Sequence, residues 1–473
     1  MSPHQTYEEI NSYVVFWGLF FSVLFALAVG YLCLKIGQTV DAFAPVSVLA
    51  MGMAVLFHRR NAFPETVHIQ AIASAGTNII GGAMFILPAL YILNIEDVSF
   101  LEMAIPIVLG GVLGVFLATV FRRYFCEEMD GVYPFPSGSA AAEVLESDEG
   151  SKAHIMLVSG AVALVYDFVL NSIGWWQELL TTTTFHWGQV LADKYKLVFS
   201  LDNDAALLGI GMLAMSGIIG LLSMSGVVVR VVKRAVADLF SKGASSSGML
   251  LRTQQDLPMT QIVFVSLLMT ILFAVFFHVM CAESLTQTVI AFVLVMLFAL
   301  MLSVVGISSI AFTGNEPVSG MTIFMIIVSA VVMGGAGMAG KTGIIAILMM
   351  AAFLCATLAV SSNFMSELKV AYITGATPKK MQQWQLVSIV LAGVVSVGVV
   401  FLMHHAYGFT GEGALAAPQA NAMAAIVKPM MDGGDAPWPL YMAGAFFAVL
   451  LWMMKIPPLA CRWASTRRSS SAV

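Results

Sequence analysis

Charge is what this sequence has least of. Asp, Glu, Lys and Arg make up only 10% of its 473 residues, whereas hydrophobic residues make up 59% and the mean hydropathy is +0.90. A soluble domain carries about 25% charged residues because its surface faces water. A chain with so little charge has to present most of its surface to lipid, which excludes a soluble globular protein. The hydrophobic runs are nearly continuous, so we expect one helical membrane domain over residues 1–473.

Motifs that would indicate an enzyme or a nucleotide-driven pump are also missing. The sequence has no GxGxxG after a strand, no Walker loop, no HExxH and no GxSxG, so we expect neither catalysis nor a cofactor. Its five cysteines form no CxxC pair and have no regular spacing, which argues against a disulfide framework and against a metal site. No basic stripe with interleaved aromatics suggests nucleic acid. A signal peptide begins with basic residues, whereas this N-terminus carries Glu8 and Glu9. We therefore expect the first apolar run to remain as a membrane helix.

Hydrophobic runs of membrane-spanning length fill most of the chain. A helix needs about 20 mostly apolar residues to cross the hydrocarbon core of a bilayer. By this rule we expect an all-α polytopic membrane protein with about twelve transmembrane helices, and with broken or re-entrant segments between some of them. The candidate spans are residues 13–34, 40–57, 67–93, 100–121, 153–174, 205–229, 260–280, 286–311, 318–338, 342–361, 384–406 and 437–455.

Basic residues recur in alternate loops, which indicates the orientation. Short cytoplasmic loops accumulate Lys and Arg. If the N-terminus is cytoplasmic, every loop that carries the basic residues given below lies on the cytoplasmic side. A loop on the opposite side carries Glu96 and Asp97. We therefore predict a multi-pass protein of the cell (inner or plasma) membrane with a cytoplasmic N-terminus. The basic residues are Arg59, Arg60, Arg122, Arg123, Arg230, Lys233, Arg234, Lys242, Arg252, Lys369, Lys379 and Lys380.

Three segments interrupt the helical pattern with Pro, Gly and amide residues. They are residues 131–145, 313–321 and 414–427, and each is too short to span a bilayer. Non-helical backbone at membrane depth is tolerated only where protein buries it or where it lines a water-filled cavity. Interrupted segments at matching places in two halves are the best sequence indication of a transporter's binding site.

The first and third of these segments also resemble each other. Residues 136–145 and 418–427 both have the pattern Pro-x-small-x-Ala-x-Ala-x-aliphatic-aliphatic. Residues 44–47 and 316–319 also share a pattern, x-Pro-Val-Ser. We therefore predict an internal two-fold repeat, with a first half over about 13–230 and a second half over about 260–455. A parallel and an inverted relation between the halves both stay open.

Five motifs stand in this order along the chain: Lys35–Val40, Glu128–Leu145, Asn315–Met321, Leu368–Pro378 and Ala417–Ala425. Together they resemble the oligopeptide transporter superfamily, which includes the yellow-stripe metal-chelate carriers. The resemblance covers about residues 13–445 and implies a secondary transporter. We expect proton-coupled import of short oligopeptides by alternating access, with peptide, protons and lipid as partners. Uptake of metal–chelate complexes is an alternative, as is an intramembrane enzyme or receptor-like subunit, and a homodimer stays open.

The C-terminus departs from this resemblance. The family pattern implies further membrane helices after Ala460, whereas residues 462–473 form an atypical polar tail. We hypothesise that this tail is a frameshifted reading and that the second half is truncated. The coding DNA tests this, because a single-base shift should restore a hydrophobic reading.

Polar residues at the three breaks are the candidate substrate-binding groups. Broken helices present unpaired N–H and C=O groups to a cavity, although a plain turn with helix capping is the alternative interpretation. The candidates are Tyr133, Pro136, Ser137 and Gly138 in the first break, Asn315, Glu316, Ser319 and Gly320 in the second, and Gln419 and Asn421 in the third.

Ionisable residues within spans are candidates for proton coupling. A charged side chain at the bilayer centre costs about 2.5–3.5 kcal/mol on insertion scales, so such residues usually mark function or a static pair. Asp167 lies inside the run 153–174, and Glu316 lies in the second break. Lys369 precedes the Gly375–Pro378 turn in an expected polar loop, where it would attract a substrate carboxylate or signal topology.

Overall fold

The computed structural model describes residues 9–39, 42–59, 61–146, 251–411 and 414–432, with a few single positions. Nearly all of them belong to one compact unit, Met1–Glu146 with Gly217–Ala436. The expected spans 153–174 and 437–455, most of 205–229, Asp167 and the tail 462–473 lie outside the described residues.

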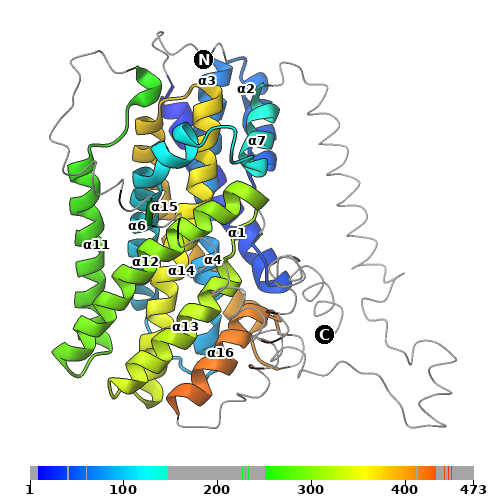
Figure 1. Ribbon diagram of the computed structural model, residues 1–473. Helices are drawn as coiled ribbons and strands as arrows, with labels where there is room; N and C mark the ends of the chain where they lie inside the picture. Colours follow the sequence, from blue (N-terminus) through cyan, green and yellow to red (C-terminus); the bar gives the residue numbers. More distant parts are fainter. Residues whose placement is uncertain are drawn as a thin grey trace, which may run out of the picture. The chain divides into compact units, whose positions relative to one another are not determined.

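All regular structure among the described residues is helical (Figure 1). In this part of the chain, seven helical stretches are long and apolar enough to cross a membrane, which confirms the all-α polytopic class. They are α1 (Ser12–Ile36), α3–α5 (Ala62–Asn78, Ile80–Met84 and Pro88–Ile92), α6 (Phe100–Arg122) with the π-helix η1 (Arg123–Glu128), the 3₁₀ turn η4 (Arg252–Gln254) leading to α11 (Met259–Met280), α12 (Leu285–Thr313), α14 (Gly340–Thr374) and α15 (Pro378–Tyr407). Shorter helices are α2 (Phe43–Leu56), α7 (Pro136–Glu146), α13 (Val318–Gly335) and α16 (Pro418–Met431).

The predicted span 342–361 was too short, because α14 continues to Thr374. No Gly or Pro interrupts the sequence between Gly343 and Gly375, so nothing in the backbone stops the helix. The polar stretch 361–369, which resembles a loop by hydropathy, is buried against other helices instead of facing lipid. Lys369 therefore lies on a helix and not in the expected polar loop.

Two long helical stretches form the centre of the described unit. In both α3–α5 and α14, 94% of the most apolar stretch is buried, compared with 22% for the stretch that contains α11. Glycine lets these elements approach closely: a Cβ on Gly82 of α4 would lie 2.7 Å from the Cα of Ala356 in α14. Figure 1 shows α14 running through the middle of the bundle while α11 lies at its edge.

The third break packs against the end of α1. Gly37 ends this helix in the left-handed conformation, with φ of 71°. Ala417, just before α16, is also left-handed, and its N–H donates to the carbonyl of Leu34 over 2.9 Å. A Cβ on Gly37 would lie 2.4 Å from Cγ of Pro418. The carbonyl acceptor thus lies three residues before the helix-ending glycine, and the proline that starts α16 lies against that glycine.

The same construction joins the first break to the end of α12. Gly314 ends α12 with φ of 73°, and Phe135, just before α7, has φ of 42°. The N–H of Phe135 donates to the carbonyl of Ala311 over 2.9 Å, again three residues before the glycine. A Cβ on Gly314 would lie 2.8 Å from Cγ of Pro136. The sequence repeat therefore has a structural counterpart, in which α1 corresponds to α12 and α16 to α7.

The two copies of this construction run in opposite directions. Glu9, just before α1, forms an ion pair with Arg252, just before α11, so both helices begin at the same end of the bundle. α11 crosses to the other end, where α12 begins and runs back (Figure 1). The two matching constructions are therefore inverted relative to each other, whereas the division of the chain into halves over about 13–230 and about 260–455 stays a prediction. Because α16 packs on α1 and α7 packs on α12, the broken helix of each predicted half contacts a helix of the other predicted half.

Several loops that the basic-residue pattern assigned to one side meet at one end of the bundle. Arg252 donates to the hydroxyl of Thr377 over 3.0 Å and to the carbonyl of Gly375 over 2.9 Å. The buried Arg122, at the end of α6, donates to both carboxylate oxygens of Asp256 over 2.6 Å. Which side of the membrane this end faces stays a prediction.

Candidate functional site

The first and second breaks are in direct contact. Besides its approach to Pro136, a Cβ on Gly314 would lie 3.5 Å from the backbone nitrogen of Ser137. A Cβ on Gly138 would lie 2.9 Å from the carbonyl oxygen of Ser366 in α14, so this position needs a glycine. The Ser137 hydroxyl is buried without a hydrogen-bond partner. The start of α7 is thus wedged between the end of α12 and the last third of α14.

Tyr133 supports this wedge from the side. Its ring is buried and packs edge-on against Phe312 of α12, with ring centroids 4.7 Å apart. It also lies 5.3 Å from the ring of Phe125. These contacts give Tyr133 a packing role at the first break.

Glu316 connects the second break to α14. Its side chain is buried, and one carboxylate oxygen accepts a hydrogen bond of 2.8 Å from the amide of Asn363. The amide oxygen of Asn363 has no hydrogen-bond partner. This carboxylate is therefore held inside the protein and not at its surface.

The other candidates of the second break lie around the start of α13. Asn315 is exposed, and its carbonyl accepts hydrogen bonds from Ser309 and Thr313 over 3.3 and 3.2 Å. Ser319 and Gly320 belong to the first turn of α13, where Gly320 is buried. These bonds hold the backbone of Asn315 against the last turns of α12, which favours the plain turn named as the alternative.

The third break joins the other two through the segment that follows α1. Gln419 is largely buried and donates to the carbonyl of Gly37 over 3.2 Å, whereas Asn421 is exposed. Two residues after Gly37, Thr39 approaches Gly81 of α4: a Cβ there would lie 3.4 Å from Thr39 and 3.6 Å from Val318, the first residue of α13. The first and second breaks therefore touch each other beside α14, and the third reaches the second through α4 and through the packing of α16 on α13.

Comparison with known proteins gives this arrangement a family. The model of a family described as OPT oligopeptide transporter protein matches residues 9–229 and 201–471, which is nearly the whole chain. The chain belongs to this oligopeptide transporter family. A protein of Haemophilus influenzae named "Putative oligopeptide transporter" is 22% identical over 479 aligned residues, which cover 84% of this chain and 74% of that protein. The predicted family is thus confirmed, and the apolar helices make the chain a multi-pass membrane transporter.

Lys369 of this transporter is already engaged with protein groups. Its ammonium donates to Asp130 over 2.5 Å and to the carbonyl of Cys126 in the π-helix η1 over 3.3 Å. It also lies 4.6 Å from the ring centroid of Tyr372. These contacts tie the loop before the first break to α14. They favour a structural role for Lys369 over direct attraction of a substrate carboxylate.

The Lys369–Asp130 pair predicts a pH dependence of stability. The hydrogen bond from Lys369 holds the pKa of Asp130 below its usual value, so the folded state favours the carboxylate. A carboxyl group whose pKa is lowered in the folded state stabilises that state. This stabilisation is complete above the ordinary aspartate pKa of about 3.9, and it is lost as the pH falls through the lowered pKa of the folded state.

We therefore expect the thermal stability difference between the native protein and Asp130→Asn to be constant from about pH 7 down to about pH 5 and to shrink below about pH 4. The difference should be small because half of the Asp130 side chain is exposed. A difference that grows on acidification would contradict this assignment.

Sequence reasoning missed Glu367 as a site residue. This glutamate is completely buried in α14, and its Oε1 accepts hydrogen bonds from Ser74 over 2.5 Å and from Asn78 over 2.7 Å. Both donors belong to α3. The polar run that contains Glu367 resembled a loop, and its partners lie 293 and 289 residues away in the sequence. Only the fold brings these groups together.

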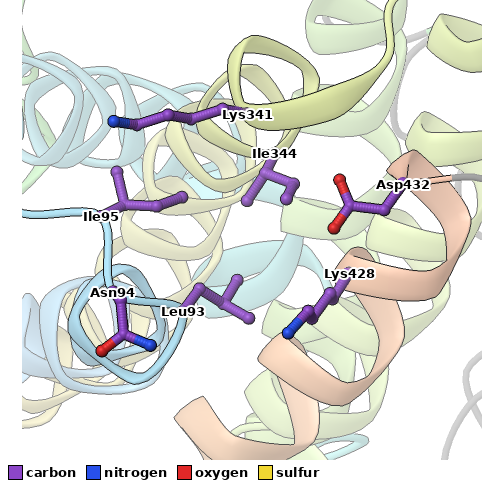
Figure 2. A pocket seen from close by; sticks show the side chains of 7 residues that line it. All are labelled: Leu93, Asn94, Ile95, Lys341, Ile344, Lys428 and Asp432. Atoms are coloured by element: carbon purple, nitrogen blue, oxygen red, sulfur yellow. The ribbon is translucent and has the colours of Figure 1, made fainter.

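A separate pocket of about 210 Å³ lies where α14 begins (Figure 2), whereas the other end of this helix lies beside Arg252 and its partner Glu9. Lys341 and Ile344 line it from the start of α14, and Lys428 and Asp432 from the end of α16. Leu93, Asn94 and Ile95 complete its wall. Lys341 also forms an ion pair with Asp97. None of the residues at the three breaks lines this pocket, so it is distinct from the region where the breaks meet.

Proposed function

We propose that this transporter is a proton-coupled symporter that imports short oligopeptides by alternating access. Membership of the family supports transport, and the name of the H. influenzae relative supports an oligopeptide substrate. The observation that carries the proposal is the meeting of three broken segments, drawn from both halves of the chain, around α4 and α14. Such breaks supply polar backbone groups at membrane depth.

The chemistry of these breaks suits a peptide. A short peptide presents amides and two charged ends, which need both donors and acceptors. We propose that the exposed amides of Asn315 and Asn421, together with Ser319 and Gln419, contact the substrate. Glu316 is a candidate for coupling from within the second break, and Asp167 remains a candidate from the sequence.

The inverted repeat supports alternating access. In inverted-repeat transporters, rocking of one repeat against the other opens a central site to either side. Here the contact of α16 with α1 and the contact of α7 with α12 are built alike but point in opposite directions. Loosening one contact while the other holds would open one side of the site, and exchanging their roles would open the other.

Uptake of labelled peptides into proteoliposomes tests the proposal. We expect labelled di- to tetrapeptides to accumulate above their external concentration when the outside is more acidic, and accumulation to stop on addition of a protonophore. Protein-free liposomes serve as the control. Accumulation that does not respond to the pH gradient would contradict proton coupling. Accumulation of a ferric chelate but not of peptides would instead establish the metal–chelate alternative.

A further inference from the structure

Glu367 lies at the centre of the bundle, between the two most buried helical stretches. None of its surface is exposed, and the two groups bound to it, Ser74 and Asn78, are also buried. Both donors bind the same oxygen, Oε1, over 2.5 and 2.7 Å. The other oxygen, Oε2, is buried and has no hydrogen-bond partner. The two oxygens of this carboxyl group therefore have very different surroundings.

No cation compensates this carboxyl group among the described residues. The ionisable groups on the elements packed against this part of α14 are each engaged elsewhere. Lys369 binds Asp130 and the Cys126 carbonyl, and Arg122 binds Asp256 and Glu127. On α3, His68 lies 3.4 Å from Glu9 and Glu65 binds Arg59. Glu316 binds Asn363, and Glu143 of α7 is itself acidic and supplies no cation. A buried carboxylate without a cation is strongly disfavoured and takes up a proton instead.

The hydrogen-bond pattern fits a protonated acid with its proton on Oε2. In that form Oε1 is a carbonyl oxygen, which accepts two hydrogen bonds, as it does here from Ser74 and Asn78. Oε2 then carries a neutral hydroxyl, and leaving this group without a partner costs far less than leaving a negative charge without one.

Glu367 is also next to the meeting point of the breaks. Asn363 precedes it by one helical turn on the same face of α14 and binds Glu316 of the second break. Ser366, its neighbour in the chain, contacts Gly138 of the first break. A movement of the breaks relative to α14 therefore acts directly on the surroundings of this carboxyl group.

We propose that Glu367 carries the coupling proton. This rests on the proposed proton-coupled symport and assigns its proton to one residue. In the conformation described, Glu367 is protonated and shielded. When rearrangement of α3 against α14 admits water to Oε2, the O–H bond breaks and the proton passes to water, leaving a carboxylate stabilised by Ser74 and Asn78. In the opposite state a hydronium ion from the acidic side transfers its proton to Oε2, which restores the O–H bond and leaves a water molecule.

Glu367→Gln separates transport from coupling, because it replaces the acid by a neutral group of nearly the same shape. We expect this variant to exchange labelled for unlabelled peptide at a rate within about twofold of the native protein. Its accumulation under a pH gradient should fall to the level reached without a gradient. Glu102→Gln makes the same chemical change in the capping box at the start of α6, where Gln also caps, and should leave both activities unchanged.

The outcomes distinguish this inference from the proposed function. If the native protein and Glu367→Gln respond equally to the pH gradient, Glu367 does not carry the coupling proton, and proton coupling itself stands. A native protein that ignores the gradient overturns both. If Glu367→Gln does not fold, Ser74→Ala provides the test, because it keeps the acid and removes one stabiliser of the carboxylate. The pH of half-maximal uptake should then move upward, and an unchanged pH profile overturns the inference.

Discussion

Gly110→Val is expected to prevent the protein from forming a stable, monodisperse fold. A Cβ on Gly110 of α6 would lie 2.2 Å from the carbonyl oxygen of Phe353 and 3.0 Å from its carbonyl carbon, both in the backbone of α14. A backbone cannot rotate away as a side chain can, so two central helices would have to separate. Overpacking a core commonly costs about 1–3 kcal/mol, and a forced separation of backbones lies at or above the upper end.

Size-exclusion chromatography of detergent-extracted protein measures this effect, as the fraction of protein in the monodisperse peak. Gly76→Val should behave in the same way, since a Cβ there would lie 2.0 Å from the carbonyl oxygen of Ser22 in α1. Gly52→Val in α2 is the matched control, because no atom lies within 4 Å of its added Cβ. If Gly110→Val were recovered as fully as Gly52→Val, the close packing of α6 on α14 described here would be wrong.

Arg122→Met is expected to destabilise the protein by about 3–5 kcal/mol, the usual cost of breaking a buried ion pair by removing one partner. The guanidinium of Arg122 is buried and bonds both oxygens of Asp256, and it also lies 2.9 Å from Glu127. Methionine would leave the carboxylate of Asp256, which is only 12% exposed, without its main cation. Thermal unfolding of the purified protein in lipid nanodiscs measures the change.

The neighbouring arginine provides the control for this prediction. The side chain of Arg123 is 58% exposed and lies 3.7 Å from Asp256, so Arg123→Met should cost less than about 1 kcal/mol. Adding Asp256→Asn to Arg122→Met should recover part of the lost stability, because it removes the carboxylate left behind. Equal effects of the two single substitutions would show that burial does not determine the strength of this ion pair.

The sequence predicted the parts of the fold that depend on local composition. Runs of apolar residues located the long helices, and Pro and Gly located the three breaks, because both signals are properties of short stretches. The extension of α14 was not predictable in this way. Its polar residues from Ser361 to Lys369 are tolerated because protein, not lipid, surrounds them.

Contacts between distant parts of the chain account for what the sequence did not reveal. The repeat was visible as Pro136 and Pro418, but its inversion depends on Gly314 and Gly37 packing against those prolines. The same holds for Glu367: nothing in its neighbourhood along the chain identifies Ser74 and Asn78 as its partners.

The central claim is that the three breaks line one water-filled site that binds the substrate. Alkylation of Asn315→Cys and Asn421→Cys by a membrane-impermeant thiol reagent in proteoliposomes tests it. Both side chains are exposed, whereas Cys33, Cys126, Cys281 and Cys355 are buried, and the fifth cysteine, Cys461, is replaced by Ser in every variant. Burial also raises the pKa of Cys281 to about 12, which keeps this thiol unreactive.

We predict that both cysteines react faster than a lipid-facing cysteine placed at Leu267, which is 44% exposed on α11. Saturating tetrapeptide should slow the two reactions together. The claim is contradicted if Asn315→Cys and Asn421→Cys react as slowly as Leu267→Cys, or if peptide protects neither of them.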